Sequence, residues 1–302
     1  MKFISSMLDT SKYNLQQLVK ITVYILLLIN YTLYIGDDWT NASYTMRDGG
    51  SILEWTAAFA TTIDETAWLI LLLLFELETH LLSYDPLSRL QTFMMNGTKF
   101  ICYLSLFHTF YAASLYVYEI SMITPIEQLN NLCDLVGKGV SFTSNLSYTD
   151  INDEVCATIS TSSQFYYLDP LQKIITDSPG FIIETQSAYI DIIDVTTWLL
   201  ILFTVEISVW LQNRDIVTGK LLKFLNITKF FLYAQLWIDM AYWGYRDHWI
   251  YAWDQFVWIA GFIAIEKNVV DWRKEINEHE NQLHSGSGSE DGIDLEIKRQ
   301  SS

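Results

Sequence analysis

Three stretches of the chain repeat one acidic pattern, in which an aspartate is followed by a tryptophan four residues later and a glutamate eight residues after that. In a helix, the aspartate and the glutamate of each stretch share a broad face and lie about 18 Å apart along the axis. A carboxylate inside an apolar helix is costly unless it meets a partner, a cavity or an ion path, and rings of carboxylates bind cations. The aspartates of the pattern are Asp64, Asp194 and Asp254, and the glutamates are Glu76, Glu206 and Glu266.

This pattern predicts a pathway for cations that is lined by the three glutamates, with Asp239 as a fourth carboxylate. The three aspartates are expected to form an outer acidic ring, which would raise the local concentration of cations. A polar residue also follows ten positions after each of three lysines, at Asn30, Thr109 and Asp239. We expect these polar residues to lie near the depth of the glutamates.

An internal repeat underlies the pattern. Residues 64–106 align without gaps to residues 194–236, with 14 identities over 43 positions that include rare residue types. Each copy joins the acidic pattern to a Lys-x-x-x-Tyr motif that begins at Lys99 or Lys229, and Lys20 begins the same motif in a third copy. The sequence therefore predicts three copies of one helical hairpin.

A structural interpretation of the same residues stays open beside the functional one. The aspartates suit the first turn of a helix, the tryptophans suit packing or an interfacial belt, and the lysines suit anchors at a membrane edge. Each glutamate would then pair with a lysine of its own hairpin, as Lys20–Glu76, Lys99–Glu206 and Lys229–Glu266. In that interpretation the carboxylates stabilise the fold and conduct nothing.

The elements that must position these residues are six apolar runs, each close to the length that crosses about 30 Å of hydrocarbon. The runs are Val19–Ile35, Thr66–Leu82, Phe100–Ile120, Val195–Leu211, Phe230–Tyr245 and Ile250–Val270. We therefore expect an all-α integral membrane protein of six transmembrane helices, with hairpins over 19–82, 100–211 and 230–270. Inner loops 83–99 and 212–229 join the hairpins, and segments 1–18 and 271–302 flank them.

Lysine and arginine are unevenly distributed between the two sides of this arrangement. Fourteen lie on the side of the two termini, against four on the opposite side. Because cytoplasmic segments are enriched in Lys and Arg, we expect both termini in the cytoplasm, at a plasma membrane or a bacterial inner membrane. The opposite, outer side is correspondingly acidic.

The outer loop 121–193 is long enough for a small folded cap. It contains Cys133 and Cys156, with 22 residues between them, on the side that is expected to be oxidising. We expect a disulfide between these two cysteines. Cys102 lies within an apolar run and suits a packed thiol.

Composition limits the classes of function. The 302 residues are 51% hydrophobic and carry a formal net charge of −17, which opposes nucleic acid as a partner. No phosphate-binding loop, hydrolase elbow or metalloprotease motif occurs, and the five histidines do not form an evident ligand set. We therefore expect neither an enzyme nor a cofactor or metal site.

The expected function is the handling of cations, by a channel or by a proton-coupled or cation-coupled transporter. The expected partners are the lipid bilayer and a monovalent cation or proton, with a second copy or another membrane protein as a further partner. The alternative is a non-catalytic scaffold or accessory subunit, whose Glu–Lys pairs are structural and whose outer loop binds a partner. An enzyme that acts on lipid at the inner interface is a third, weaker class.

Overall fold

The computed structural model describes residues 2–81, 88–212, 214 and 219–263, and the predicted site residue Glu266 lies outside these ranges. The chain divides into two compact units. One unit holds Leu26–Gln255, and the other holds Met1–Ile25 together with Phe256–Ser302. Each unit is described by itself.

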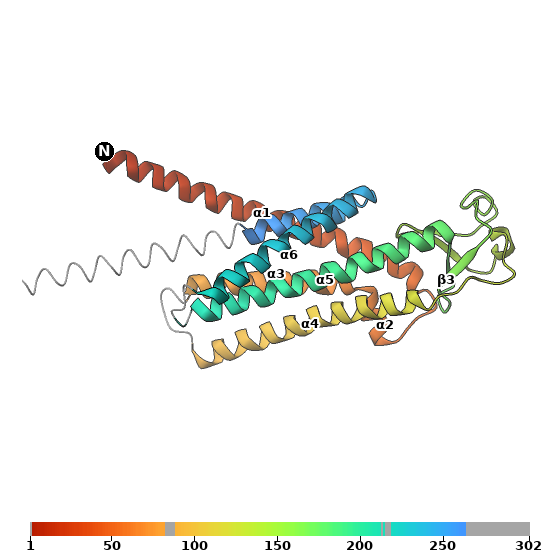
Figure 1. Ribbon diagram of the computed structural model, residues 1–302, viewed down its shortest axis with the longest axis horizontal. Coiled ribbons are helices and arrows are strands. Elements are labelled where there is room, and N and C mark those ends of the chain that lie inside the picture. The colour runs from red at the N-terminus through yellow and green to blue at the C-terminus, as the bar shows by residue number, and fades with distance from the viewer. Residues whose placement is uncertain (1, 82–87, 213, 215–218, 264–302) are drawn as a thin grey trace, which may run out of the picture. The chain divides into compact units, whose positions relative to one another are not determined.

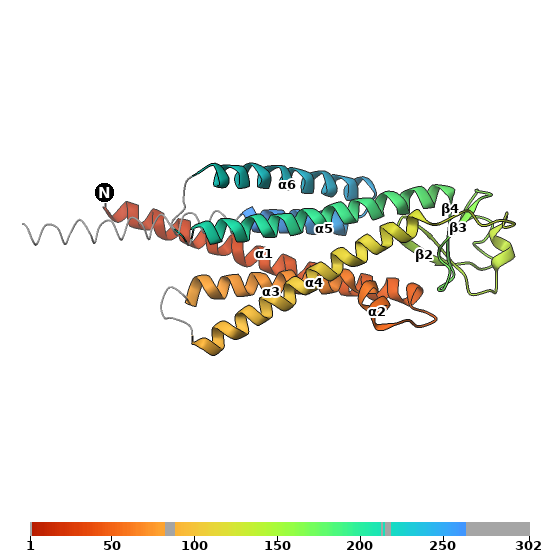
Figure 2. The same cartoon turned by 60° about the horizontal axis from the view of Figure 1, so that its bottom comes forward.

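The larger unit is built mainly of helices that pack in chain order (Figure 1, Figure 2). Helix α3 packs against α4, α4 against α5, and α5 against α6. The core between them contains Leu106 of α4, Ile201 of α5 and Leu236 of α6, all essentially buried. The helices are α1 (Lys2–Thr45, of which residues from 26 belong here), α2 (Ile52–Ala58), α3 (Ala60–Leu81), α4 (Arg89–Ser121), α5 (Ser178–Gln212) and α6 (Lys220–Tyr245), and a further helical segment covers 249–263, of which residues up to 255 belong here.

Local sequence signals set where two of these helices begin. Ser51 precedes α2, its hydroxyl accepts a hydrogen bond from the backbone of Glu54, and the Glu54 carboxylate accepts one in return. Ser88 and Gln91 form the same reciprocal arrangement at the start of α4. Such capping boxes satisfy backbone N–H groups that have no partner within the helix. Helices α2 and α3 meet at a bend of 71°.

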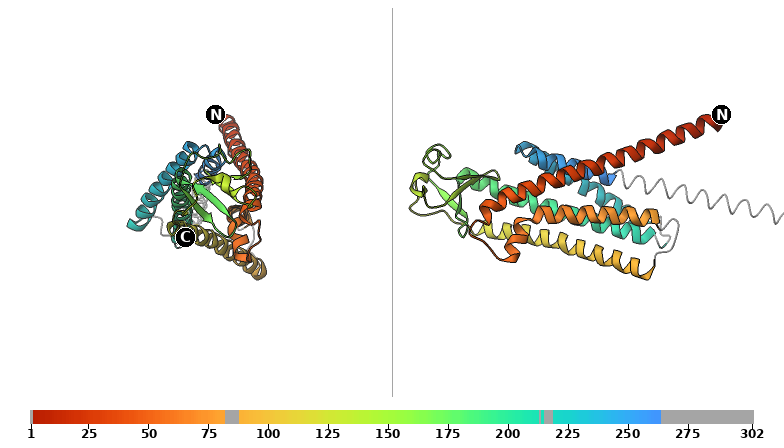
Figure 3. Two further views of the ribbon diagram at one scale, coloured as in Figure 1. Left: turned by 90° about the vertical axis from the view of Figure 1, so that its right-hand side faces the viewer. Right: turned by 180° about the vertical axis from the view of Figure 1, so that it is seen from behind.

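A four-stranded mixed sheet forms within the segment that was predicted to be an outer loop. Its strands are β1 (Ser141–Ser144), β2 (Ser147–Asp150), β3 (Phe165–Asp169) and β4 (Ile174–Asp177), in the order β2-β1-β4-β3. The pairs β1–β2 and β3–β4 are antiparallel, and β1–β4 is parallel. Residues 122–177, which we call the cap, lie at one end of α4 and α5 (Figure 3).

The cap has its own apolar core and its own covalent link. Leu132, Phe142, Phe165 and Ile175 are buried against one another. A disulfide joins Cys133 to Cys156, with their Cα atoms 4.9 Å apart. The predicted disulfide is therefore confirmed, and Cys102 is a buried free thiol as expected.

Several contacts join the cap to the rest of this unit, and those at Gly180 and at Asn145 are the most specific. Strand β4 continues into α5, where the backbone N–H of Gly180 donates to Asp177 Oδ1 at 2.8 Å. A Cβ on Gly180 would lie 2.1 Å from Thr176 Oγ1, so only glycine fits at this position. In the β1–β2 turn, Asn145 Oδ1 accepts two hydrogen bonds from the Arg246 guanidinium, and Asn145 Nδ2 donates to the Arg246 carbonyl.

The prediction of an all-α protein with six membrane-spanning helices is wrong. A mixed sheet occupies part of the predicted loop, and α5 begins at Ser178, inside that loop. Among the described residues, one helix is long and apolar enough to cross a membrane, namely α4, with a mean hydropathy of 1.4. A second would be added if α2 and the part of α3 up to residue 77 formed one bent span.

The prediction of six membrane-spanning helices failed because several of the apolar runs pack within the protein. Several of them are parts of longer helices that bury polar groups against other helices. In α6, for example, Asp239 interrupts the run and is fully buried. Hydrophobic periodicity alone does not distinguish a helix buried in protein from a helix facing lipid.

The smaller unit combines the first part of α1 with residues 256–263 among those described. Gly261 allows these two segments to approach closely, because a Cβ there would lie 3.1 Å from Val23 Cγ1. The Lys20 ammonium lies 5.9 Å from the centre of the Tyr24 ring, so the Lys-x-x-x-Tyr motif forms a cation–π contact in this copy.

Candidate functional site

The most unusual residue of the larger unit is Asp239, near the middle of α6. Its side chain has an exposed fraction of 0%. Its Oδ1 accepts a hydrogen bond from Gln235 Nε2 at 3.0 Å, one helical turn away. Its Oδ2 has no hydrogen-bond partner among the residues that the structure describes. A buried carboxylate oxygen without a partner is costly, so it marks a candidate site rather than a structural contact.

Helix α5 places two further carboxylates near Asp239. Asp191 and Asp194 are three residues apart and therefore lie on one face of α5. Asp194 Oδ1 accepts a hydrogen bond from Gln255 Nε2 at 2.6 Å. Both aspartates lie close enough to Asp239 for its charge to act on them.

The electrostatics of this pair favour protonated carboxyls. Burial, followed by the nearby charges of Glu184 and Asp239, raises the pKa of Asp191 to about 7. Burial and the charge of Asp239 also raise the pKa of Asp194 well above its ordinary value, although the hydrogen bond from Gln255 acts in the opposite direction. Both effects disfavour the ionised form.

The helical segment 249–263 supplies Asp254, whose exposed fraction is 6%. Asp254 Oδ1 accepts a hydrogen bond from Nδ2 of the buried Asn30, on α1, at 2.9 Å. The Tyr34 hydroxyl, one turn further along α1, also donates to Asp254. The Tyr34 ring stacks on Tyr251 with 5.7 Å between ring centres, which fixes this end of α1 against the segment that carries Asp254.

Helix α3 contributes Asp64, whose pKa is raised to about 7 by burial, while the side chains of Thr109 on α4 and of Trp68 act in the opposite direction. The charges of Asp64 and Asp194 interact, as do those of Asp64 and Asp254. The structure thus brings together the three aspartates of the repeated pattern, which were expected to form an outer ring. We call Asp64, Asp191, Asp194, Asp239 and Asp254 the aspartate cluster.

The tryptophans that the repeat equates also meet. The rings of Trp68 on α3 and Trp198 on α5 are 5.7 Å apart in an edge-to-face arrangement, and both are buried. Such aromatic contacts favour one relative placement of the two helices. Each tryptophan therefore helps to hold the aspartate that precedes it by four residues.

The repeated glutamates have a different environment. Glu206 is exposed on α5, and its Oε1 accepts a hydrogen bond from the Tyr103 hydroxyl of α4 at 2.5 Å. Glu76 is half-buried on α3. The pathway through the glutamates stays a prediction, and so do the pairs Lys20–Glu76, Lys99–Glu206 and Lys229–Glu266.

Helical spacing in the sequence selected several members of this site. Asn30, Thr109 and Asp239 were expected near the depth of the glutamates, which stays a prediction, and in the structure they contact or belong to the aspartate cluster. Asp191 and Gln255 were not predicted. The spacing of Asp191 and Asp194 on one helix face is the signal that could have identified Asp191.

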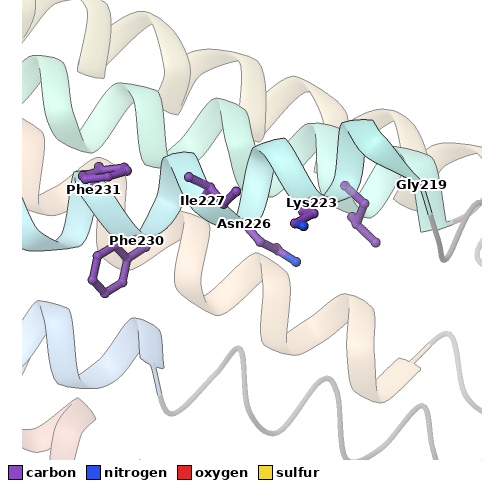
Figure 4. Close-up of a pocket in the computed structure, with 7 residues that line it drawn as sticks. Gly219, Lys223, Asn226, Ile227, Phe230 and Phe231 are labelled. Atoms are coloured by element: carbon purple, nitrogen blue, oxygen red, sulfur yellow. The ribbon is translucent and has the colours of Figure 1, made fainter.

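Two negative findings limit the chemistry of the site. Over the described part of the chain, no group of three His, Cys, Asp or Glu side chains is arranged to hold a metal ion. A surface pocket on α6 is lined by Gly219, Leu222, Lys223, Asn226, Ile227, Phe230 and Phe231 (Figure 4). It contains none of the carboxylates, so it is not part of the aspartate cluster.

Comparison of the chain with protein-family models, with curated proteins and with solved structures gives no match.

Proposed function

We propose that this protein takes up and releases monovalent cations, the proton included, through the aspartate cluster, in association with a lipid bilayer. The proposal rests on one observation above the others. Asp239 is fully buried, has a carboxylate oxygen with no partner among the described residues, and lies near two more aspartates on α5.

The charge balance of the cluster supports this role. Within the described residues, none of its five aspartates forms an ion pair with a lysine or arginine. Five ionised carboxylates whose charges act on one another would repel, and the buried Asp239 and Asp254 would also lose their hydration. They must be neutralised by cations or protons, and a site that exchanges such ions can handle them for the rest of the molecule.

The association with a bilayer rests on α4. Its most apolar stretch is only 17% buried, and Phe100, Ile101, Leu104 and Phe107 are exposed along it. We propose that this surface contacts the hydrocarbon of a plasma membrane or a bacterial inner membrane.

An orientation follows from the two ends of α4. Arg89 and Lys99 lie toward its first end, which suits the cytoplasmic side, and the disulfide-bonded cap follows its last residue, which suits an oxidising outer side. The prediction that both termini are cytoplasmic depended on six membrane crossings. Because that arrangement is wrong, nothing now supports a cytoplasmic location for both termini.

The proposed role is not enzymatic. One observation favours the alternative of a scaffold or accessory subunit, because Glu206 links α4 to α5 through Tyr103 and so serves the packing of helices. That observation concerns the glutamates and leaves the aspartate cluster without a structural explanation.

The experiment is a flux measurement in liposomes that contain the purified full chain. We expect wild type to carry a proton or monovalent-cation flux and the Asp194→Asn/Asp239→Asn variant to lose most of it. Asp153→Asn, which makes the same change at an exposed position of the cap, is the matched control and should match wild type. Equal flux in all three proteins, or flux no higher than in empty liposomes, would contradict the proposal.

A further inference from the structure

We infer that the cation bound by the aspartate cluster is the proton, and that Asp239 is one of the groups that bind it. This inference rests on the proposed function, and it narrows the transported ion from monovalent cations in general to the proton. In the binding step, Asp239 Oδ2 gains a proton and becomes a hydroxyl, and the charge of the side chain changes from −1 to zero.

The first argument comes from Asp239 Oδ2. This oxygen is buried and no donor of the described residues reaches it, while Oδ1 of the same group is satisfied by Gln235. An ionised carboxylate in this position would keep a negative charge on an oxygen that neither water nor protein solvates. A proton on Oδ2 removes that charge without requiring space for a larger ion.

The second argument comes from the amides that surround the cluster. Asn30, Gln235 and Gln255 each donate an N–H to a carboxylate of the cluster, at 2.9, 3.0 and 2.6 Å respectively. A metal cation is bound by oxygen ligands, and an amide serves it through its carbonyl oxygen. Here three amides use their N–H groups on the carboxylates, which is the arrangement that suits carboxyls without a metal ion between them.

The third argument comes from the geometry of the carboxylates. Within the ranges that the structure describes, no three acidic, histidine or cysteine side chains converge as metal ligands would. The aspartates are instead spread over α3, α5, α6 and the segment 249–263, and they influence one another by charge. A series of separated carboxyls can pass a proton from one group to the next, whereas a metal ion needs several ligands at once.

The carboxyls around Asp239 also favour protons within the cluster. Burial raises the pKa of Asp239 to about 6, although the hydrogen bond from Gln235 acts in the opposite direction. The charge of Asp239 in turn raises the pKa of Asp191 and of Asp194 on α5, and Glu184 acts on Asp191 in the same way. Further along the cluster, Asp64 of α3 acts on Asp194 and on Asp254, so the ionisation of one carboxyl makes the next one harder to ionise.

The test is infrared difference spectroscopy of the purified full chain, which reports the C=O stretch of a protonated carboxyl. Because burial raises the pKa of Asp239 to about 6, we expect this signal in wild type below that pH, its reduction by roughly one carboxyl per chain in Asp239→Asn, and its retention in the exposed control Asp153→Asn. Retention of the whole signal in Asp239→Asn would overturn the inference. Loss of the wild-type signal when choline chloride is replaced by sodium chloride would also overturn it, because sodium would then displace the proton.

A second variant covers the case in which Asp239→Asn does not fold. Gln235→Leu removes the amide whose hydrogen bond lowers the pKa of Asp239, so the carboxyl signal of Asp239 should titrate away at a higher pH. An unchanged titration would contradict the assignment of the proton to Asp239.

The infrared spectrum tests the proton site and the flux measurement tests the proposed function, so either proposal can be contradicted without the other. A carboxyl signal that follows these expectations in a protein without flux supports the proton site and contradicts the proposed function. A flux of sodium ions without any protonated carboxyl supports the proposed function and contradicts the proton site.

Discussion

At the scale of single residues, the aspartate cluster depends on amides as much as on acids. Asn30 is 1% exposed, and its Nδ2 donates to Asp254. A neutral amide can donate to a carboxyl in either protonation state, whereas a lysine would hold it ionised. The amides therefore fix the positions of the aspartates and leave them free to titrate.

Replacing Asn30 should reveal how much this support contributes. Asn30→Ala removes the donor and leaves Asp254 Oδ1 buried without it, so we expect a loss of about 1–3 kcal/mol in the free energy of unfolding. Asn96→Ala, at an exposed position of α4, is the matched control and should change stability by less than about 0.5 kcal/mol. Chemical unfolding of the purified protein followed by circular dichroism measures both. A loss of similar size in the two variants would show that the Asn30 contact is unimportant.

The residues of the aspartate cluster show which parts of the candidate site could be predicted from the sequence. The positions of Asn30, Thr109 and Asp239 were selected from helical spacing alone, and all three are buried. Their contacts with the aspartates were not predicted, because spacing gives the face on which a residue lies and not the helix that this face meets. That information comes from tertiary packing such as the Trp68–Trp198 contact.

At the scale of elements, the sequence predicted a loop for residues 121–193 and did not predict the strands of the cap. Its strands have only four or five residues, and the β1–β2 turn at Asn145 and Leu146 has positive φ angles of 54° and 58° without a glycine. Two-residue hairpin turns of this kind are usually recognised by Asn-Gly or Asp-Gly. The disulfide was predictable, because two cysteines on an oxidising side need no knowledge of the strands between them.

The disulfide should contribute a measurable part of the stability of the cap. Cys133→Ser/Cys156→Ser releases a loop with 22 residues between the cysteines, so we expect a loss of about 3 kcal/mol from the cap. Limited proteolysis within 122–177 should then be faster, while the helices remain protected. The matched measurement is wild type treated with a reductant, which should behave like the double variant. Unchanged cleavage in both would mean that the cap core of Leu132, Phe142 and Phe165 suffices.

At the scale of the whole molecule, acidic residues outnumber basic ones 35 to 18. The sequence assigned much of this excess to an outer face. The structure shows that part of it lies within the larger unit, where Asp239 and Asp254 are buried and Asp64, Asp191 and Asp194 are partly buried, without basic partners among the described residues. Membrane topology could not be predicted from the apolar runs, because α6 buries Asp239 within one of them.

This burial predicts how stability depends on pH. The pKa of Asp191 is raised to about 7 and that of Asp194 is raised as well, whereas an aspartate of the unfolded chain ionises near ~3.9. Between these values the folded state binds more protons than the unfolded state, so stability is fully present at low pH and decreases as the pH rises toward 7. Asp194→Asn should weaken this decrease, which has a limiting slope of about 1.4 kcal/mol per pH unit for each group.

Unfolding measured between about pH 4 and pH 8 tests the prediction. Asp153→Asn, with its exposed side chain, should follow the wild-type curve. A wild-type stability that increases steadily over this range would contradict the placement of protonated aspartates inside the fold.

The contact between Asn145 and Arg246 has a consequence for how the protein is made. Asn145-Leu146-Ser147 matches the acceptor motif for N-linked glycans, and glycans are attached to the amide nitrogen of the asparagine. In the folded protein that nitrogen donates to the Arg246 carbonyl and the amide oxygen is bound by the guanidinium. A glycan on Asn145 would replace one hydrogen of this nitrogen and place a bulky group beside Arg246, so glycosylation and docking of the cap compete for the same side chain. In a glycosylating compartment, the order of sugar transfer and docking at Asn145 therefore affects how the cap meets the end of α6.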